Sequence, residues 1–132
     1  LIALFDAGID EVVVVLGHHA EQIEPVVQKF PVTRVHNPSP DDGQVSSQRL
    51  GLQALSAKLD AVLVALADQP LIDARDITAL IGAYSKRPQG TAVVVPQVAG
   101  QPGNPVIFSA AARAAGCLTS STMLRLLRLQ VR

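Results

Sequence analysis

The chain of 132 residues has little cysteine, no long apolar run and no charged leader followed by an apolar stretch. Its one cysteine, Cys117, can form no disulfide within the chain and cannot alone make a zinc site. The longest apolar runs, residues 12–16 and 61–67, are far shorter than the roughly 20 residues that cross a bilayer. We therefore expect a cytoplasmic protein without a membrane segment.

Aromatic residues are equally scarce, and acidic residues are absent after Asp76. One tyrosine and three phenylalanines cannot provide a series of stacking platforms for single-stranded nucleic acid. Residues 1–76 sum to 5 minus 11, or −6, and residues 77–132 to +6. A basic half can face phosphates, but a solvated basic surface is the commoner meaning of such a charge. We predict no nucleic-acid partner.

Short apolar segments alternate with amphipathic ones along the chain. The β-branched segments predict strands at residues 11–16, 32–36, 60–66, 91–95 and 105–108. The others predict helices at residues 1–7, 19–30 with a bend at Pro25, 45–55, 72–84 with Asp73 as cap, 110–115 and 121–131. Such alternation indicates parallel βαβ units, so we predict an α/β fold with a three-layer, doubly wound, mostly parallel sheet. The length suits one domain, residues 1–132.

Asp68 is the sharpest candidate for a functional side chain. In open parallel sheets, ligands bind beyond the carboxyl ends of the strands, and Asp68 follows an apolar strand there. Packing of the core does not require a carboxylate at that point, whereas a Mg²⁺ ion that is bound against substrate phosphates does require one. A cap for the next helix, or an Asx turn before Pro70, explains Asp68 equally well. The residues alone leave both interpretations open.

Three other polar residues have a plainer interpretation. His18 and His19 follow the first strand but lack a third ligand at suitable spacing, so a helix cap is favoured over a metal site. Cys117 lies in an alanine-rich stretch with no histidine nearby, which favours a packed thiol over a nucleophile.

Four segments, in order, resemble the MobA-like NTP transferases, and among them the molybdenum cofactor cytidylyltransferases most closely. They are DEVVVVLGHH at residues 10–19, HNP with GQVSSQRLGL within residues 36–52, DAVLVALADQP at residues 60–70, and GNPVIF at residues 103–108. The resemblance extends over residues 1–108. It implies a Rossmann-like fold of the nucleotide-diphospho-sugar transferase type.

The resemblance also implies a reaction and its partners. Such an enzyme transfers a nucleoside monophosphate, with CMP favoured, from an NTP to the phosphate of molybdopterin during molybdenum cofactor maturation. The implied cofactor is Mg²⁺, and the implied substrates are CTP or GTP and a molybdopterin-type acceptor. A molybdoenzyme or a chaperone is the implied protein partner.

Individual residues match the family's functional positions. By this resemblance Asp68 is the catalytic, metal-binding carboxylate, and Gly43, Ser46 and Ser47 approach the nucleotide at a loop-to-helix entry. Arg49 would reach phosphate, although an exposed helix arginine is the commoner outcome. Gly103, Asn104 and Pro105 would line the acceptor side; a hairpin turn that feeds an edge strand explains Asn104 equally well.

Two parts of the family's pattern have no counterpart in the sequence. The first strand and the glycine-rich loop with an arginine and a lysine would precede Leu1, so we expect an N-terminally truncated domain. A second metal-binding aspartate, in a Gly-Asp motif, has no equivalent in residues 116–121, and residues 116–132 form an atypical tail. A site with one carboxylate should bind Mg²⁺ weakly.

Two other functions stay open. One is an NTP transferase with another phosphorylated acceptor, such as a sugar phosphate or an alcohol phosphate. The other is a degenerate, non-catalytic α/β module that binds a nucleotide or a protein. Dependence of nucleotide binding on Mg²⁺ and on Asp68 distinguishes the transferase from the module.

Overall fold

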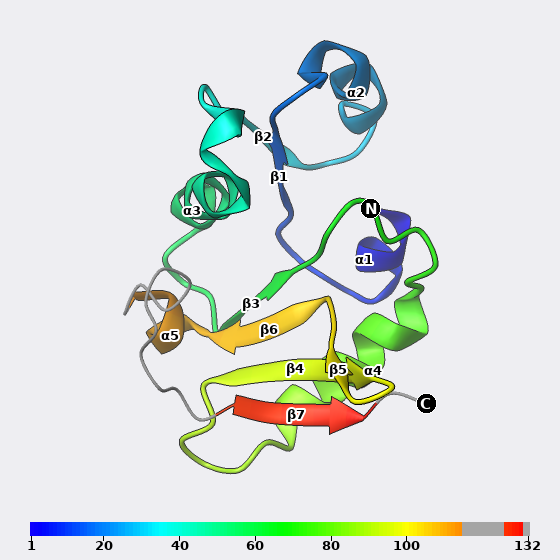
Figure 1. The fold of residues 1–132 in the computed structure, drawn as a ribbon, viewed down its shortest axis with the longest axis vertical. Coiled ribbons are helices and arrows are strands. Elements are labelled where there is room, and N and C mark those ends of the chain that lie inside the picture. The colour runs from blue at the N-terminus through cyan, green and yellow to red at the C-terminus, as the bar shows by residue number, and fades with distance from the viewer. Residues whose placement is uncertain (115–125, 131–132) are drawn as a thin grey trace. The chain divides into compact units, whose positions relative to one another are not determined.

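The computed structural model describes residues 1–114 and 126–130 (Figure 1). The chain divides into two compact units. The first holds Leu1 and Ile9–Lys58, and the second holds Ile2–Gly8 and Leu59–Arg132. In the part of the chain that is described, no helix is long and apolar enough to cross a membrane.

The first unit is built on two parallel strands. Its elements are β1 (Val13–Leu16), α2 (Ala20–Val27), β2 (Thr33–His36), the short 3-10 helix η1 (Pro40–Asp42) and α3 (Gln44–Ala54). Leu16 pairs with His36, so both strands end at the same edge of the sheet. The valine-rich sequence of β1 suits a strand that helices cover, and both α2 and α3 contact it. Val12, Leu16 and Val27 are buried here.

The second unit contains a five-stranded sheet. Its elements are α1 (Ile2–Asp6), β3 (Ala61–Val64), α4 (Ala74–Ser85), β4 (Val93–Val98), β5 (Gln101–Pro102), β6 (Val106–Ser109), α5 (Ala110–Ala114) and β7 (Leu126–Gln130). The strands lie in the order β3-β6-β4-β5, with β7 paired to β4 (Figure 1). Leu80 and Tyr84 of α4 pack on Val94 and Ile107 of the sheet and form its core.

The expected mostly parallel sheet is observed only in part. The pairs β1–β2 and β4–β7 are parallel, but β6 runs antiparallel to both β3 and β4. The reversal follows from the hairpin between β4 and β5, where Ala99 and Gly100 have φ angles of 51° and 78°. Two successive positive φ angles make the tight turn that joins antiparallel strands. An alternation of strands and helices does not reveal such a reversal.

The predicted helix at residues 121–131 is wrong where the structure describes it, because residues 126–130 form strand β7. A short apolar segment fits either period, and pairing along β4 selects the strand. The five other predicted helices correspond to α1, α2, α3, α4 and α5, and α2 contains Pro25. Cys117 and most of the tail at residues 116–132 lie outside the described residues. The assignment of residues 1–132 to one domain stays a prediction.

Candidate functional site

The loop that follows β2 is organised by the buried side chain of Asn37. The Asn37 backbone N–H donates to the Leu16 carbonyl, which continues the parallel ladder by one residue. Its Nδ2 donates to Ser46 Oγ at 2.8 Å and to Ser47 Oγ at 2.9 Å. Its Oδ1 accepts from the Ser39 N–H at 2.9 Å. A single residue therefore joins the end of the sheet through its backbone to the loop and the first turn of α3 through its side chain.

Gly43 starts α3 in a conformation that only glycine adopts readily. Its φ and ψ angles are 86° and 176°, and it occupies the N-cap position. Ser46 Oγ donates back to the Gly43 carbonyl at 2.8 Å. Gly43 is exposed, and Ser46 and Ser47 are half-buried. The structure thus brings together three of the four residues predicted for the nucleotide side.

Arg49, the fourth, lies one helical turn further along α3 and is exposed. Within residues 1–114 and 126–130 it has neither an ion pair nor a side-chain hydrogen bond. This placement suits an exposed helix arginine as well as a phosphate ligand. Its contact with phosphate stays a prediction.

Asp68 lies four residues beyond the end of β3 and is exposed. The cap of the following helix is Asp73, which excludes the capping explanation for Asp68. Nor does the Asp68 carboxylate accept a hydrogen bond from any described residue, as an Asx turn would require. The carboxylate therefore has no structural task in the described part of the chain.

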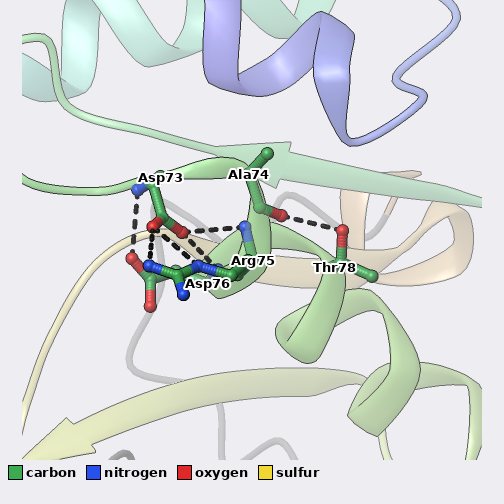
Figure 2. A network of polar contacts seen from close by, with 5 residues as sticks. All are labelled: Asp73, Ala74, Arg75, Asp76 and Thr78. Carbon is green, nitrogen blue, oxygen red and sulfur yellow. Dashed lines mark hydrogen bonds and ion pairs between the residues drawn. The ribbon is translucent and has the colours of Figure 1, made fainter.

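The N-terminus of α4 is closed by a capping box (Figure 2). Asp73 Oδ1 accepts from the backbone N–H groups of Arg75 and Asp76, and Asp76 Oδ2 accepts from the Asp73 N–H. The Arg75 side chain also donates to Asp73 Oδ2 at 2.9 and 3.1 Å. The Arg75 guanidinium, followed by the Asp76 N–H, lowers the pKa of Asp73 below its usual value.

Residues 103–105 enter β6 at the sheet's interior. The Gly103 N–H donates to the Pro96 carbonyl at 2.8 Å, which draws the segment back against β4. Asn104 is half-buried and Pro105 is buried. The hairpin of this region turns at Ala99 and Gly100, so residues 103–105 are not its turn, and β6, which they precede, lies between β3 and β4 and is not an edge strand. Asn104 therefore stands at the start of a central strand.

Asp68 and residues 103–105 emerge from the same end of the second unit's sheet. Val64, the last residue of β3, pairs with Val106, the first of β6 (Figure 1). The start of the segment after β3 therefore lies beside the end of the segment before β6. Gly43, Ser46, Ser47 and Arg49 belong to the first unit.

The three histidines have partners or positions that do not suggest a metal site. His18 Nε2 lies 3.2 Å from Asp41, and His36 Nε2 lies 3.4 Å from Glu24. His19 holds the N-cap position of α2, as predicted for one of the pair, but its side chain makes no capping hydrogen bond. Among the described residues, no three His, Cys, Asp or Glu side chains gather to hold a metal ion.

Two polar side chains near the candidate site, Asn37 and Gln69, are not among the residues predicted from the sequence. Asn37 belongs to the HNP segment, and an asparagine directly after a predicted strand is visible in the sequence, but its burial and its hydrogen bonds are visible only in the structure. The Gln69 Oε1 atom, next to Asp68, is buried without a hydrogen-bond partner in the described part of the chain. No pattern in the sequence marks its burial.

Comparison with known families decides the relationship. The model of the MobA-like NTP transferase domain matches residues 1–128. The chain belongs to this family. It is thus a member of a nucleotidyltransferase family, and the resemblance seen in its motifs is confirmed at that level. No protein of curated function matches its sequence.

Solved structures confirm the fold of this MobA-like chain. Rv0371c from Mycobacterium tuberculosis superposes with a TM-score of 0.79 at 18% identity, covering 98% of this chain and 70% of that one. A structure of Rv0371c with manganese superposes with a TM-score of 0.76 at 20% sequence identity, covering 98% of this chain and 73% of that one. The 4-diphosphocytidyl-2C-methyl-D-erythritol synthase of Anaerococcus prevotii superposes with a TM-score of 0.75 at 14% sequence identity, covering 98% of this chain and 73% of that one. Molybdopterin-guanine dinucleotide biosynthesis protein A of Archaeoglobus fulgidus superposes with a TM-score of 0.57 at 15% sequence identity, covering 90% of this chain and 63% of that one.

Proposed function

We propose that this chain belongs to a nucleotidyltransferase that moves CMP from CTP to the phosphate of a molybdopterin-type acceptor. The family supports the transfer of a nucleotide, and the sequence resemblance to the cytidylyltransferases favours cytidine and molybdopterin. The observation that carries the proposal is Asp68, an exposed carboxylate without a structural task in the segment that follows β3.

The proposed reaction is a substitution at phosphorus. An oxygen of the acceptor's phosphate forms a bond to the α-phosphorus of CTP. The bond from that phosphorus to the oxygen bridging to the β-phosphorus breaks, and pyrophosphate leaves with the electron pair. Catalysis of such a step consists mainly of positioning the substrates and neutralising their charge, so the protein need not form a covalent bond to either substrate.

The residues at Asp68 fit a divalent cation such as Mg²⁺. Mg²⁺ usually takes one or two carboxylates and completes its shell with water and phosphate oxygens. Both oxygens of Asp68 can serve, since no described residue bonds to them. When bound, the ion would neutralise charge on the triphosphate. The manganese in the structure of Rv0371c is consistent with a divalent ion in this fold.

The remaining predicted residues divide between the two substrates. Gly43, Ser46 and Ser47 would contact the nucleotide, with Arg49 near its phosphates. Gly103, Asn104 and Pro105 would bound the acceptor, because they begin beside the segment that carries Asp68. A molybdoenzyme or a chaperone would receive the product.

Isothermal titration of CTP and GTP, with Mg²⁺ and with EDTA, tests this proposal. We expect Mg²⁺-dependent binding with CTP preferred, and a loss of affinity of roughly tenfold or more in Asp68→Asn. The melting temperature should not change, since the carboxylate bonds to no described residue. Asp60→Asn is the matched control: it removes the same charge from the other end of β3.

Pyrophosphate release with different acceptors then separates the two transferase functions. Pyrophosphate release that requires molybdopterin supports the proposal. Release with a sugar phosphate or an alcohol phosphate instead contradicts the molybdopterin acceptor and supports a transferase with that other acceptor. Nucleotide binding that is indifferent to Mg²⁺ and to Asp68→Asn contradicts catalysis and supports a binding module.

A further inference from the structure

Ser46 and Ser47 are neighbours in sequence, but their hydroxyl groups are used differently. Each Oγ accepts one hydrogen bond from Asn37 Nδ2, at 2.8 and 2.9 Å. Ser46 also donates its proton, to the Gly43 carbonyl at 2.8 Å. The hydroxyl proton of Ser47 has no acceptor among the described residues. Only Ser47 therefore retains a donor for a ligand.

Asn37 decides this arrangement. An asparagine amide has two N–H donors, and here each is committed to one of the serines. The Ser39 N–H donates to Oδ1, so the amide cannot rotate to exchange its oxygen and nitrogen without losing that bond. Asn37 is also one of two buried polar residues in the described chain, which holds its side chain in place.

We propose that Asn37 is a positioning residue: it directs the Ser47 hydroxyl proton toward an oxygen of the bound nucleotide, while Ser46 secures Gly43. A hydroxyl that accepts a hydrogen bond becomes a better donor, so the bond from Asn37 both aims and strengthens the Ser47 donor. This inference rests on the proposed nucleotide-binding function of the same loop, and adds a division of labour between the two serines.

Titration of CTP in the presence of Mg²⁺ measures the donor role of Ser47. Ser47→Ala should weaken binding roughly tenfold, the usual effect of losing a hydrogen bond to a charged group. Ser47→Thr keeps the hydroxyl and should restore most of the affinity. Equal affinity of wild type and Ser47→Ala overturns the assignment.

A double-mutant cycle tests whether Asn37 acts through Ser47. Asn37→Asp keeps the shape but replaces the two donors by an acceptor, so the serine protons turn inward and CTP binding falls. If the effect passes through Ser47, Asn37→Asp weakens binding by less in the Ser47→Ala background than in wild type. A charge effect on the phosphates would instead add in full and shrink with added salt. Full additivity overturns the positioning role.

Thermal unfolding without nucleotide tests the structural half separately. Ser46→Ala loses the bond to Gly43 and an acceptor for Asn37, whereas Ser47→Ala loses only an acceptor. Ser46→Ala should therefore lower the melting temperature more. The reverse order overturns the division of labour even where CTP binds. Absence of CTP binding to wild type, with the expected order of melting temperatures, overturns the proposed function and the ligand role of Ser47 but leaves the loop's architecture intact.

Discussion

Two glycines inside helices illustrate how surroundings decide the meaning of a residue. Gly51 lies in α3 and Gly82 in α4, and both cost helix propensity relative to alanine. A Cβ at Gly51 would lie 3.0 Å from Val15 Cγ2, whereas at Gly82 no heavy atom of the described residues lies within 4 Å. Gly51 thus permits α3 to approach β1, and Gly82 has no such role.

The two glycines should respond oppositely to alanine. Gly82→Ala should raise the free energy of unfolding by about 0.5–1 kcal/mol through lower chain entropy. Gly51→Ala should lower it by about 1 kcal/mol, because crowding against Val15 outweighs the same gain. Urea denaturation measures both changes. A stabilised Gly51→Ala would show that α3 and β1 separate easily.

The same residue scale applies to the candidate site. Asp68 and Asn37 both follow a strand, yet Asn37 is buried with three side-chain hydrogen bonds and Asp68 is exposed with none to a described residue. Their position after a strand is visible in the sequence. Which of them serves the fold and which is free for a ligand depends on how the loop that follows each strand folds, as when α3 returns Ser46 and Ser47 to Asn37.

At the scale of elements, α4 is the helix whose signals agree best. Asp73 caps it, and Ile77, Leu80 and Tyr84 are buried along one side. Its C-terminal end is tied by Arg87, which donates to the carbonyls of Tyr84 and Thr91 and stacks 3.6 Å from the centre of the Tyr84 ring. Caps and an apolar stripe thus act together, and the predicted helix at residues 72–84 closely matches the observed one.

The capping box predicts a pH dependence. The pKa of Asp73 is lower in the folded chain than its usual value, so its stabilising effect is complete above that usual value and is lost as the pH falls through the lowered pKa. Asp73→Ala should lower the melting temperature by a few degrees at pH 7, and the difference from wild type should shrink below about pH 4.

Asp76→Ala is the control, since it removes the reciprocal bond to the Asp73 N–H and the charge near Arg75 but leaves the Asp73 carboxylate in place. It should lower the melting temperature less than Asp73→Ala at neutral pH. Added salt should reduce both effects, because the cap is exposed. A difference between Asp73→Ala and wild type that stays constant from pH 7 to pH 3 would contradict the role of the ionised carboxylate.

At the scale of the whole molecule, burial is distributed unevenly between the two units. The second unit holds most of the buried apolar side chains, among them Val94, Ile107 and Phe108. The first unit has a two-stranded sheet and buries Val12, Leu16 and Val27. Regions with fewer buried contacts open at lower free energy.

Hydrogen exchange followed by mass spectrometry should therefore separate the units. We expect the slowest amides in β4 and β6, and faster exchange in β1 and β2. Phe108→Ala should remove about 3–5 kcal/mol of packing and accelerate exchange throughout the second unit. Ala57→Ser, at an exposed position, serves as the control. Slower exchange in β1 than in β6 would contradict this order.

The family and the positions of the helices and strands could be predicted from the sequence because they depend on local patterns. Runs such as VVVVL, the Asp73 cap and four motifs in order are properties of neighbouring residues. They indicated five of the helices and the MobA-like relationship that the family comparison confirms.

The direction of β6, the strand at residues 126–130 and the partners of Asn37 were decided only by the tertiary structure. The first two depend on pairing with a distant segment, β6 with β3 and residues 126–130 with β4, and the third depends on how the loop folds to bring the start of α3 back to Asn37. A short apolar segment is compatible with several partners and directions, so its local pattern leaves them undetermined. The sequence by itself determined the nature of most elements, and long-range hydrogen bonding determined how they pair.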